Sequence, residues 1–227
     1  MFQISYDEFT ELLNTGQVKK AIKRKNKKIK FDLEKFKQLF LYILEKCGNK
    51  PNVGETVLYK LLYFCDFDYF EIYEKALTGM TYRRLQYGPV PAQQLFNPLI
   101  KEMIAENMIE RINRPYIGET VQTKYMNFVK ADLSDFNNQE RDVIDKVINR
   151  LSDLSARQIE NHAHGDYPWK SHKDGEEIEY SSVFQRTGEF AQRDYEMEFL
   201  EASEEDAFGD LNPLTEEEYE YYTSLKE

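Results

Sequence analysis

Apolar residues recur at helical spacing along much of the chain, which predicts a mainly helical protein. The clearest amphipathic segment begins after Asp32, which suits a helix N-cap, and ends at Gly48. The main predicted helices cover residues 33–47, 54–74, 92–107, 137–151 and 155–165. Capping-box patterns open the last two of them. Shorter helices are predicted over residues 5–16, 179–191 and 216–225.

The segment 54–74 is apolar around most of its circumference. One apolar stripe runs from Val57 to Cys65, and a second runs from Tyr59 to Phe70. A helix with apolar residues on most of its faces is buried by neighbours on several sides. We therefore expect this segment to be the central helix of the fold.

Two segments with strand-like composition, 108–111 and 121–129, flank a polar turn. Because a helix is predicted directly before them, the arrangement looks like the helix and hairpin of a winged helix. Residues 81–85 are expected to be extended, and Gly88 with Pro89 then excludes a helix. The predicted fold class is α+β, mainly α-helical, with a helical core and a small antiparallel β-hairpin that is winged-helix-like.

Charge is unevenly distributed along the chain, whose formal net charge is −11. Residues 189–227 hold 14 acidic and two basic residues, whereas residues 1–188 hold 27 acidic and 28 basic residues. Eight Lys and Arg residues form a basic run between Lys19 and Lys30. We therefore expect three parts: an N-terminal helix and basic run over 1–30, a domain over 31–188, and an acidic C-terminal extension over 189–227.

The sequence argues against several classes of protein. No apolar run reaches the roughly 20 residues of a membrane-spanning helix, and the N-terminus lacks the layout of a signal peptide, so we expect a cytoplasmic protein without membrane contact. Cys47 and Cys65 share no metal-ligand spacing and are expected to be buried and free. His162 and His164 would point about 200° apart on a helix, so no metal site is expected. Without a Gly-rich phosphate loop or a nucleophile motif, we predict neither an enzyme nor a cofactor.

Four short segments follow one another along the chain: Tyr59–Phe64, Thr78–Tyr82, Tyr87–Pro91 and His162–Trp169. In their order and spacing they resemble the Panacea domain family, known through the SocA-type antitoxins of bacteria and phages. The resemblance covers residues 31–186. It implies a protein that neutralises a cognate toxin, encoded by an adjacent gene, through direct protein–protein binding rather than catalysis.

The resemblance also implies a set of contact residues near these segments. Tyr, Trp and Arg dominate interface hot spots, so the region from Tyr82 to Tyr87 is the leading candidate for binding the toxin. The candidate toxin-binding residues are Tyr63, Asp66, Tyr82, Arg83, Arg84, Tyr87, His162 and Trp169. For Asp66, a satisfied polar group at the edge of the core is the alternative to a surface contact. The residues expected to shape the motif are Lys60, Leu61, Leu62, Phe64, Gly88, Pro89, Val90 and Pro168.

Other functions remain as alternatives: a DNA-binding transcriptional autoregulator, an adaptor that presents the toxin to a protease, or a hydrolase with an unfamiliar fold. The predicted helix 92–107 has Lys101 as its only base and carries Glu102 and Glu106, which argues against specific DNA reading. The basic run Lys19–Lys30 is a solvated linker, a weak nucleic-acid contact, a toxin contact, or a partner of the acidic tail. Because the tail mixes aromatic residues with carboxylates, we expect part of it to dock on that run or on a basic toxin surface.

Overall fold

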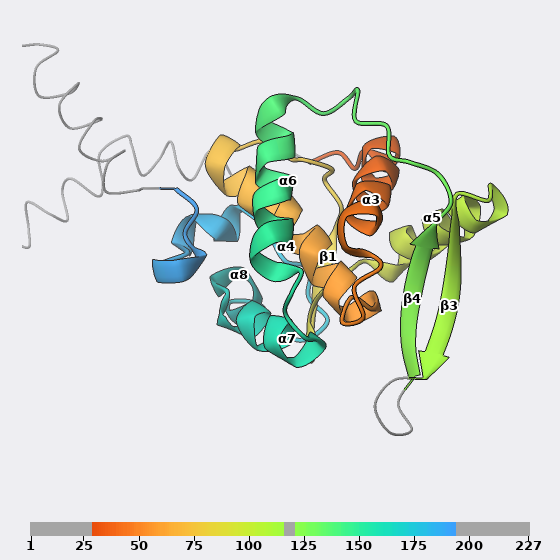
Figure 1. The fold of residues 1–227 in the computed structure, drawn as a ribbon. Helices are drawn as coiled ribbons and strands as arrows, with labels where there is room; N and C mark the ends of the chain where they lie inside the picture. The colour runs from red at the N-terminus through yellow and green to blue at the C-terminus, as the bar shows by residue number, and fades with distance from the viewer. Residues whose placement is uncertain (1–28, 116–120, 194–227) are drawn as a thin grey trace, which may run out of the picture. The chain divides into compact units, whose positions relative to one another are not determined.

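The structure, a computed structural model, describes residues 29–115 and 121–193 (Figure 1). The chain divides into two compact units, 1–190 and 191–227, and the fold described below is that of the first.

Several predicted segments lie outside the described residues. They are the helix over 5–16, the basic run up to Lys28, the acidic extension beyond Arg193 and the helix over 216–225. In the part of the chain that the structure describes, no helix combines the length and apolarity needed to span a membrane.

Helices α3 and α4 form the centre of the fold. α3, Leu33–Cys47, begins at the predicted N-cap, where the Asp32 side chain accepts a hydrogen bond from the Lys35 backbone N–H at 3.0 Å. α4, Glu55–Tyr73, buries residues on nearly all its faces and runs behind α6 through the middle of the helices in Figure 1. It contacts α3, α6, α7 and β2, so the prediction of a central helix is confirmed.

Two antiparallel hairpins accompany the helices. β3, Ile109–Pro115, pairs with β4, Val121–Asn127, directly after helix α5, Gln93–Ala105. This pairing confirms the predicted helix and hairpin. The fold class is α+β and mainly α-helical, as predicted.

The second hairpin is a difference from the predicted single hairpin. β1, Tyr82–Leu85, pairs with β2, Gly88–Pro91, from Tyr82 opposite Pro91 to Leu85 opposite Gly88. The prolines of β2 lack an N–H group and so favour the prediction of an unpaired connection. β2 tolerates them, however, because within the described residues it pairs only with β1 and so lies at the edge of the sheet.

The C-terminal half of the first unit consists of short helical elements: α6, Asn138–Leu151; α7, Ala156–Gly165; α8, Tyr167–Lys170; and the 3-10 turns η2, Tyr180–Gln185, and η3, Gly188–Phe190. Both predicted capping boxes are present, at the starts of α6 and α7. The prediction of one helix over 179–191 is wrong. Arg186 is extended, with φ −65° and ψ 145°, and Gly188 has a left-handed φ of 60°, so the helix cannot continue through them.

One cluster of buried residues joins these elements, and its centre is aromatic. The rings of Tyr63 and Phe67 lie 4.3 Å apart, and the ring of Tyr82 lies 5.5 Å and 5.7 Å from them. Cys47 and Cys65 are buried and free, as expected. The aromatic residues of α4 therefore serve mainly as core.

Candidate binding site

The first and last of the four family-like segments meet inside the core. Tyr63 lies on α4, and Asp166 lies 103 residues later, immediately before α8. The Tyr63 hydroxyl donates a hydrogen bond of 2.7 Å to Asp166 Oδ2, and both side chains are fully buried. This contact explains why two distant segments act as one unit of the fold.

A buried arginine completes the contact. Arg186 Nε and Nη2 donate to the two oxygens of Asp166 at 2.8 Å and 2.7 Å. Its Nη1 donates to Asp68 at 2.7 Å and to Glu71 at 2.9 Å. Burial alone would lower the pKa of Arg186, but Asp166 and Asp68 raise that pKa by more, so the guanidinium stays charged. We call Arg186, Asp68, Glu71 and Asp166 the arginine cluster.

The arginine cluster has a structural role. It ties α4 to the turn before α8 and to the end of η2. Arg150 of α6 adds a hydrogen bond of 2.6 Å to the second oxygen of Asp68. A planar guanidinium suits such bidentate contacts, and here it satisfies carboxylates that would otherwise be buried without sufficient positive charge.

Asp66 forms a separate buried polar site on α4. Its carboxylate accepts hydrogen bonds from the Thr78 backbone N–H and hydroxyl at 2.8 Å, and from the Tyr82 hydroxyl at 2.7 Å. Burial raises the pKa of Asp66 to about 6, although these hydrogen bonds act to lower it.

The raised pKa of Asp66 predicts a pH-dependent stability. Asp66 titrates near pH 6 when folded and near 4 when unfolded, so its contribution is fully present below about pH 4 and declines as the pH rises to about 6. Between those limits, we expect the wild type to lose up to about 3 kcal/mol relative to Asp66→Asn, which does not titrate. Urea unfolding of both proteins from pH 4 to pH 7 measures the difference. If the stabilities of the wild type and Asp66→Asn changed with pH in parallel, the raised pKa of Asp66 would be contradicted.

Three of the predicted contact residues need correction. Tyr63, Asp66 and Tyr82 have no exposed surface, and a side chain without exposed surface cannot meet a partner. Asp66 is a satisfied polar group, but it lies inside the core and not at its edge. The aromatic rings bury their large apolar surface while their hydroxyls find buried carboxylates.

Other predicted contact residues gather around the β1–β2 hairpin. Tyr87, in the turn, exposes 63% of its surface. Trp169 of α8 donates from Nε1 to the Leu85 carbonyl at 3.1 Å. The Arg84 guanidinium lies 4.3 Å over the Trp169 ring, and the His164 ring stacks on it at 4.1 Å. The guanidinium of Arg84 and the ring of His164 cannot both occupy one face of the indole, so Trp169 lies between them.

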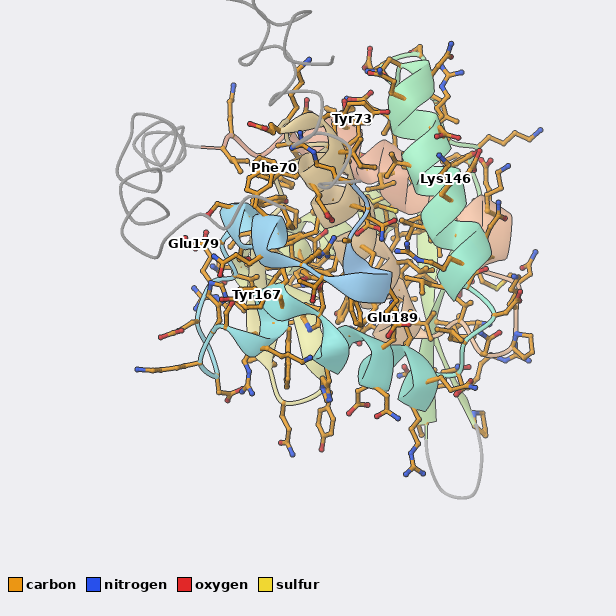
Figure 2. The ribbon with its side chains drawn as sticks, turned by 90° about the vertical axis from the view of Figure 1, so that its left-hand side faces the viewer. Phe70, Tyr73, Lys146, Tyr167, Glu179 and Glu189 are labelled. Atoms are coloured by element: carbon orange, nitrogen blue, oxygen red, sulfur yellow. The ribbon has the colours of Figure 1, made fainter. Side chains whose placement is uncertain are left out.

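The segment after α8 holds the two arginines of β1 in place. Arg83 Nη1 donates to the Gly175 carbonyl at 2.9 Å, and Arg84 Nη1 contacts Asp174 at 3.1 Å. Figure 2 looks onto α8, with Tyr167 labelled, and β1 and β2 (yellow) run behind it. We call this surface the hairpin face, formed by Arg83, Arg84, Leu85, Tyr87, His164 and Trp169.

His162 does not belong to the hairpin face. Its ring stacks on Phe190 at 4.8 Å and lies 5.2 Å from the ring of Phe64. Burial and the nearby Arg150 lower the pKa of His162. Among the described residues, no group of three or more His, Cys, Asp or Glu side chains is arranged to hold a metal ion.

The residues expected to shape the motif lie where the hairpin meets α4 and α8. Leu61, Leu62, Phe64, Gly88, Pro89 and Pro168 are buried, and Val90 is half-buried. Gly88 has a φ of 97°, and a Cβ atom there would lie 2.7 Å from Lys60 Cε. Glycine at this position therefore satisfies both the backbone conformation and the close approach of Lys60.

The helix before the β3–β4 hairpin lacks the charge of a DNA-reading helix. Lys101, Glu102 and Glu106 are all exposed on or just after α5. Glu102 also pairs with Lys37 of α3 at 2.6 Å. The exposed charges of this element are therefore mostly acidic, and they would repel the phosphate groups of a DNA backbone.

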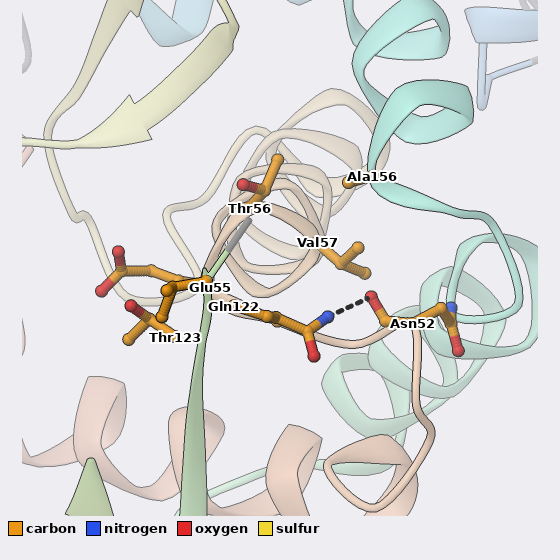
Figure 3. A pocket seen from close by; sticks show the side chains of 9 residues that line it. Asn52, Glu55, Thr56, Val57, Gln122, Thr123 and Ala156 are labelled. Carbon is orange, nitrogen blue, oxygen red and sulfur yellow. Dashed lines mark hydrogen bonds between the residues drawn. The ribbon is translucent and has the colours of Figure 1, made fainter. Parts of the chain in front are cut away.

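A pocket of about 250 Å³ opens at the start of α4, away from all predicted contact residues (Figure 3). Gln122 of β4 crosses it and donates to the Asn52 carbonyl at 3.5 Å. Glu55, the one carboxylate among the described residues that line the pocket, already accepts a hydrogen bond of 2.6 Å from Tyr125. Those described residues offer no pair of groups suited to acid–base or metal chemistry.

Sequence reasoning missed Arg186, Asp166 and His164. Fully buried charged residues are rare, so an Arg in a short predicted helix such as 179–191 is naturally taken as a surface residue. Asp166 does stand inside a family-like segment, between Gly165 and Tyr167. This position inside a family-like segment was the signal that could have indicated a structural role for Asp166.

The geometry defines a mainly helical α+β domain that is held together by buried ion pairs and carries an exposed hairpin face. Residues 58–170 match the family model described as "Antitoxin SocA-like, Panacea domain". Residues 58–170 therefore form a SocA-like Panacea domain, and the resemblance drawn from the sequence is confirmed over these residues. A search of curated proteins gave no match. A search of solved structures gave none either.

Proposed function

We propose that this protein is an antitoxin that neutralises a cognate toxin by binding it directly in the cytoplasm. The observation that carries the proposal is the match of residues 58–170 to a domain family described as antitoxin SocA-like. The toxin is expected to be the product of an adjacent gene. Neutralisation then depends on an interface rather than on a reaction.

The hairpin face is the best-supported contact surface for the toxin. It combines the exposed Tyr87 with a half-buried Trp169 and two arginines, Arg83 and Arg84. The segment after α8 fixes the positions of both arginines. Aromatic and arginine side chains held in this way lose little conformational entropy on binding and are enriched in interface hot spots. His162 remains a candidate at the periphery, because it is only half-buried.

Co-expression tests the proposal. The full chain should restore growth of cells that express the neighbouring toxin, and the two proteins should co-purify as a stable complex. Tyr87→Ala and Arg84→Ala should each weaken binding roughly 30-fold or more, because hot-spot truncations cost about 2 kcal/mol. Isothermal titration calorimetry of the purified pair measures the loss.

Phe128→Ala is the matched control, because Phe128 is also an exposed aromatic residue but follows β4, away from the hairpin face. It should bind like the wild type. Rescue of growth without any complex would refute direct binding. Equal losses in all three variants would refute the hairpin face as the contact surface.

A further inference from the structure

Strand β3 presents an accessible edge. β4 is the strand of this hairpin that packs on α3 and α4, and Figure 1 shows β3 on its outer side. Within the described residues, β3 pairs with no strand other than β4. Its residues from Glu110 to Pro115 are exposed, except Ile112, which is half-buried. Another strand can therefore approach this edge from the solvent.

The outer edge of β3 carries the backbone groups of its odd-numbered residues. Met108 and Phe128 continue the register of the hairpin, and the Phe128 N–H donates to the Met108 carbonyl at 2.8 Å, so they form a hydrogen-bonded pair. Such pairs alternate with non-bonded pairs along an antiparallel ladder, so the even-numbered residues of β3 bond to β4. The N–H and carbonyl groups of Arg111 and Asn113 therefore point outward, toward a possible neighbour.

Two charged residues of β3 have no counter-charge opposite them in the hairpin. Glu110 lies opposite Met126, and Arg114 lies opposite Gln122. Burial and, after it, the nearby Arg114 lower the pKa of Lys124, because the two cations repel each other. The hairpin itself therefore gives Arg114 a like charge as a neighbour and leaves Glu110 opposite an apolar side chain.

The side chains along this edge are complementary to themselves. Residues 110, 112 and 114 share one face of β3, because side chains alternate along a strand. They are Glu, Ile and Arg, so an antiparallel copy places Arg, Ile and Glu opposite them. In a two-fold pair centred on Ile112, Glu110 of each chain lies opposite Arg114 of the other. Charges usually protect an edge strand from pairing, but this register brings opposite signs together.

We propose that the free edge of β3 is an interface between two copies of this chain, which join into a four-stranded antiparallel sheet in the order β4, β3, β3 and β4. Arg111 of each chain lies opposite Asn113 of the other, so the outward backbone groups pair. The half-buried Ile112 side chains meet at the centre. A second copy fits this edge better than an unrelated strand, because the charge pattern complements itself.

This interface goes beyond the proposed antitoxin function, since it uses no residue of the hairpin face. Each copy keeps its own hairpin face, so the dimer carries two toxin contact surfaces. The experiments below on the chain alone do not involve the toxin. Their failure would therefore leave the antitoxin function untouched.

Charge exchange tests the register. Sedimentation of the purified full chain at increasing micromolar concentrations should show a monomer–dimer equilibrium, because one strand edge is a small interface. Glu110→Arg places like charges opposite each other at two symmetric positions, so the dissociation constant should rise about tenfold or more. Arg114→Glu should have the same effect. The double variant Glu110→Arg/Arg114→Glu exchanges the two charges and should return to within about threefold of the wild type.

Arg157→Glu is the matched control, because it makes the same change of charge as Arg114→Glu at an exposed position on α7. It should dimerise like the wild type. If the wild type stays monomeric at the highest concentration, the proposed interface is refuted. A double variant that is as weak as the single ones would refute the pairing of Glu110 with Arg114.

Asn113→Pro tests the backbone pairing without changing a charge. The proline removes an outward N–H and leaves the bonds to β4, as Pro115 already does at the end of the strand. The variant should keep the circular dichroism spectrum of the wild type and lose the dimer. Dimerisation at wild-type strength would overturn the proposal. So would a monomeric wild type whose binding to the toxin is weakened by Asn113→Pro, because β3 would then pair with a strand of the toxin.

Discussion

An Arg186→Met variant should lose a large part of the folding stability of this protein. Methionine removes the guanidinium that binds Asp68, Glu71 and Asp166 together, and it leaves these carboxylates in the core. Removing one partner of a buried ion pair typically costs 3–5 kcal/mol, because the remaining charge is uncompensated. Since domains of this size are stable by about 5–15 kcal/mol, such a loss should lower the urea midpoint of unfolding strongly. Urea unfolding followed by circular dichroism measures the loss.

The matched control for this prediction is Arg111→Met. Arg111 of β3 is also an arginine paired with a carboxylate, Glu55, but at 3.4 Å and with 51% of its side chain exposed. Exposed pairs contribute about 0–1 kcal/mol, so this control should unfold near the wild-type midpoint. If Arg186→Met has the same midpoint as Arg111→Met, the arginine cluster does not hold the fold together. Arg186→Lys should fall between them, because lysine keeps the charge but loses the bidentate contact.

The helices of this protein could be predicted from local sequence features. Asp32 and Gly48 bound α3 as expected, and capping boxes mark the starts of α6 and α7. Apolar residues on most faces of segment 54–74 identified the central helix. Such features act within a few residues, so one sequence is enough to see them.

The β1–β2 hairpin and the arginine cluster depend on contacts between distant segments. The pairing of β1 with β2 is supported by Trp169, which reaches the Leu85 carbonyl from 84 residues away. Arg186 meets Asp68 across 118 residues. No local pattern records such a contact, and a helix was predicted where Arg186 turns inward.

The candidate contact residues also divide into some that lie in the core and some that are exposed, and local sequence does not tell the two groups apart. Tyr63 and Tyr82 have the composition of hot-spot residues, but their hydroxyls bind Asp166 and Asp66 in the core. Tyr87, five residues after Tyr82, lies in an exposed turn. A tyrosine suits the core and the interface for the same reason, which is an apolar ring with a polar end, so residue type alone does not separate the two.

Gly88→Val should give the second large loss of stability. Valine at a φ of 97° is strained, which costs about 1–3 kcal/mol. Its Cβ would also lie 2.7 Å from Lys60 Cε, and overpacking of this kind typically adds about 1–3 kcal/mol. We therefore expect a total of roughly 2–6 kcal/mol, measured by urea unfolding.

Gly175→Val separates the two causes. Gly175 has a similar φ of 79°, but a Cβ atom there would meet nothing within 4 Å, so this control carries the strain without the clash. In a Lys60→Ala background, the clash at residue 88 is removed, and the cost of Gly88→Val should fall to that of Gly175→Val. An unchanged cost in that background would show that Lys60 does not set the requirement for glycine. If Gly88→Val kept the wild-type unfolding midpoint but no longer neutralised the toxin, Gly88 would be a contact residue and not a determinant of backbone shape.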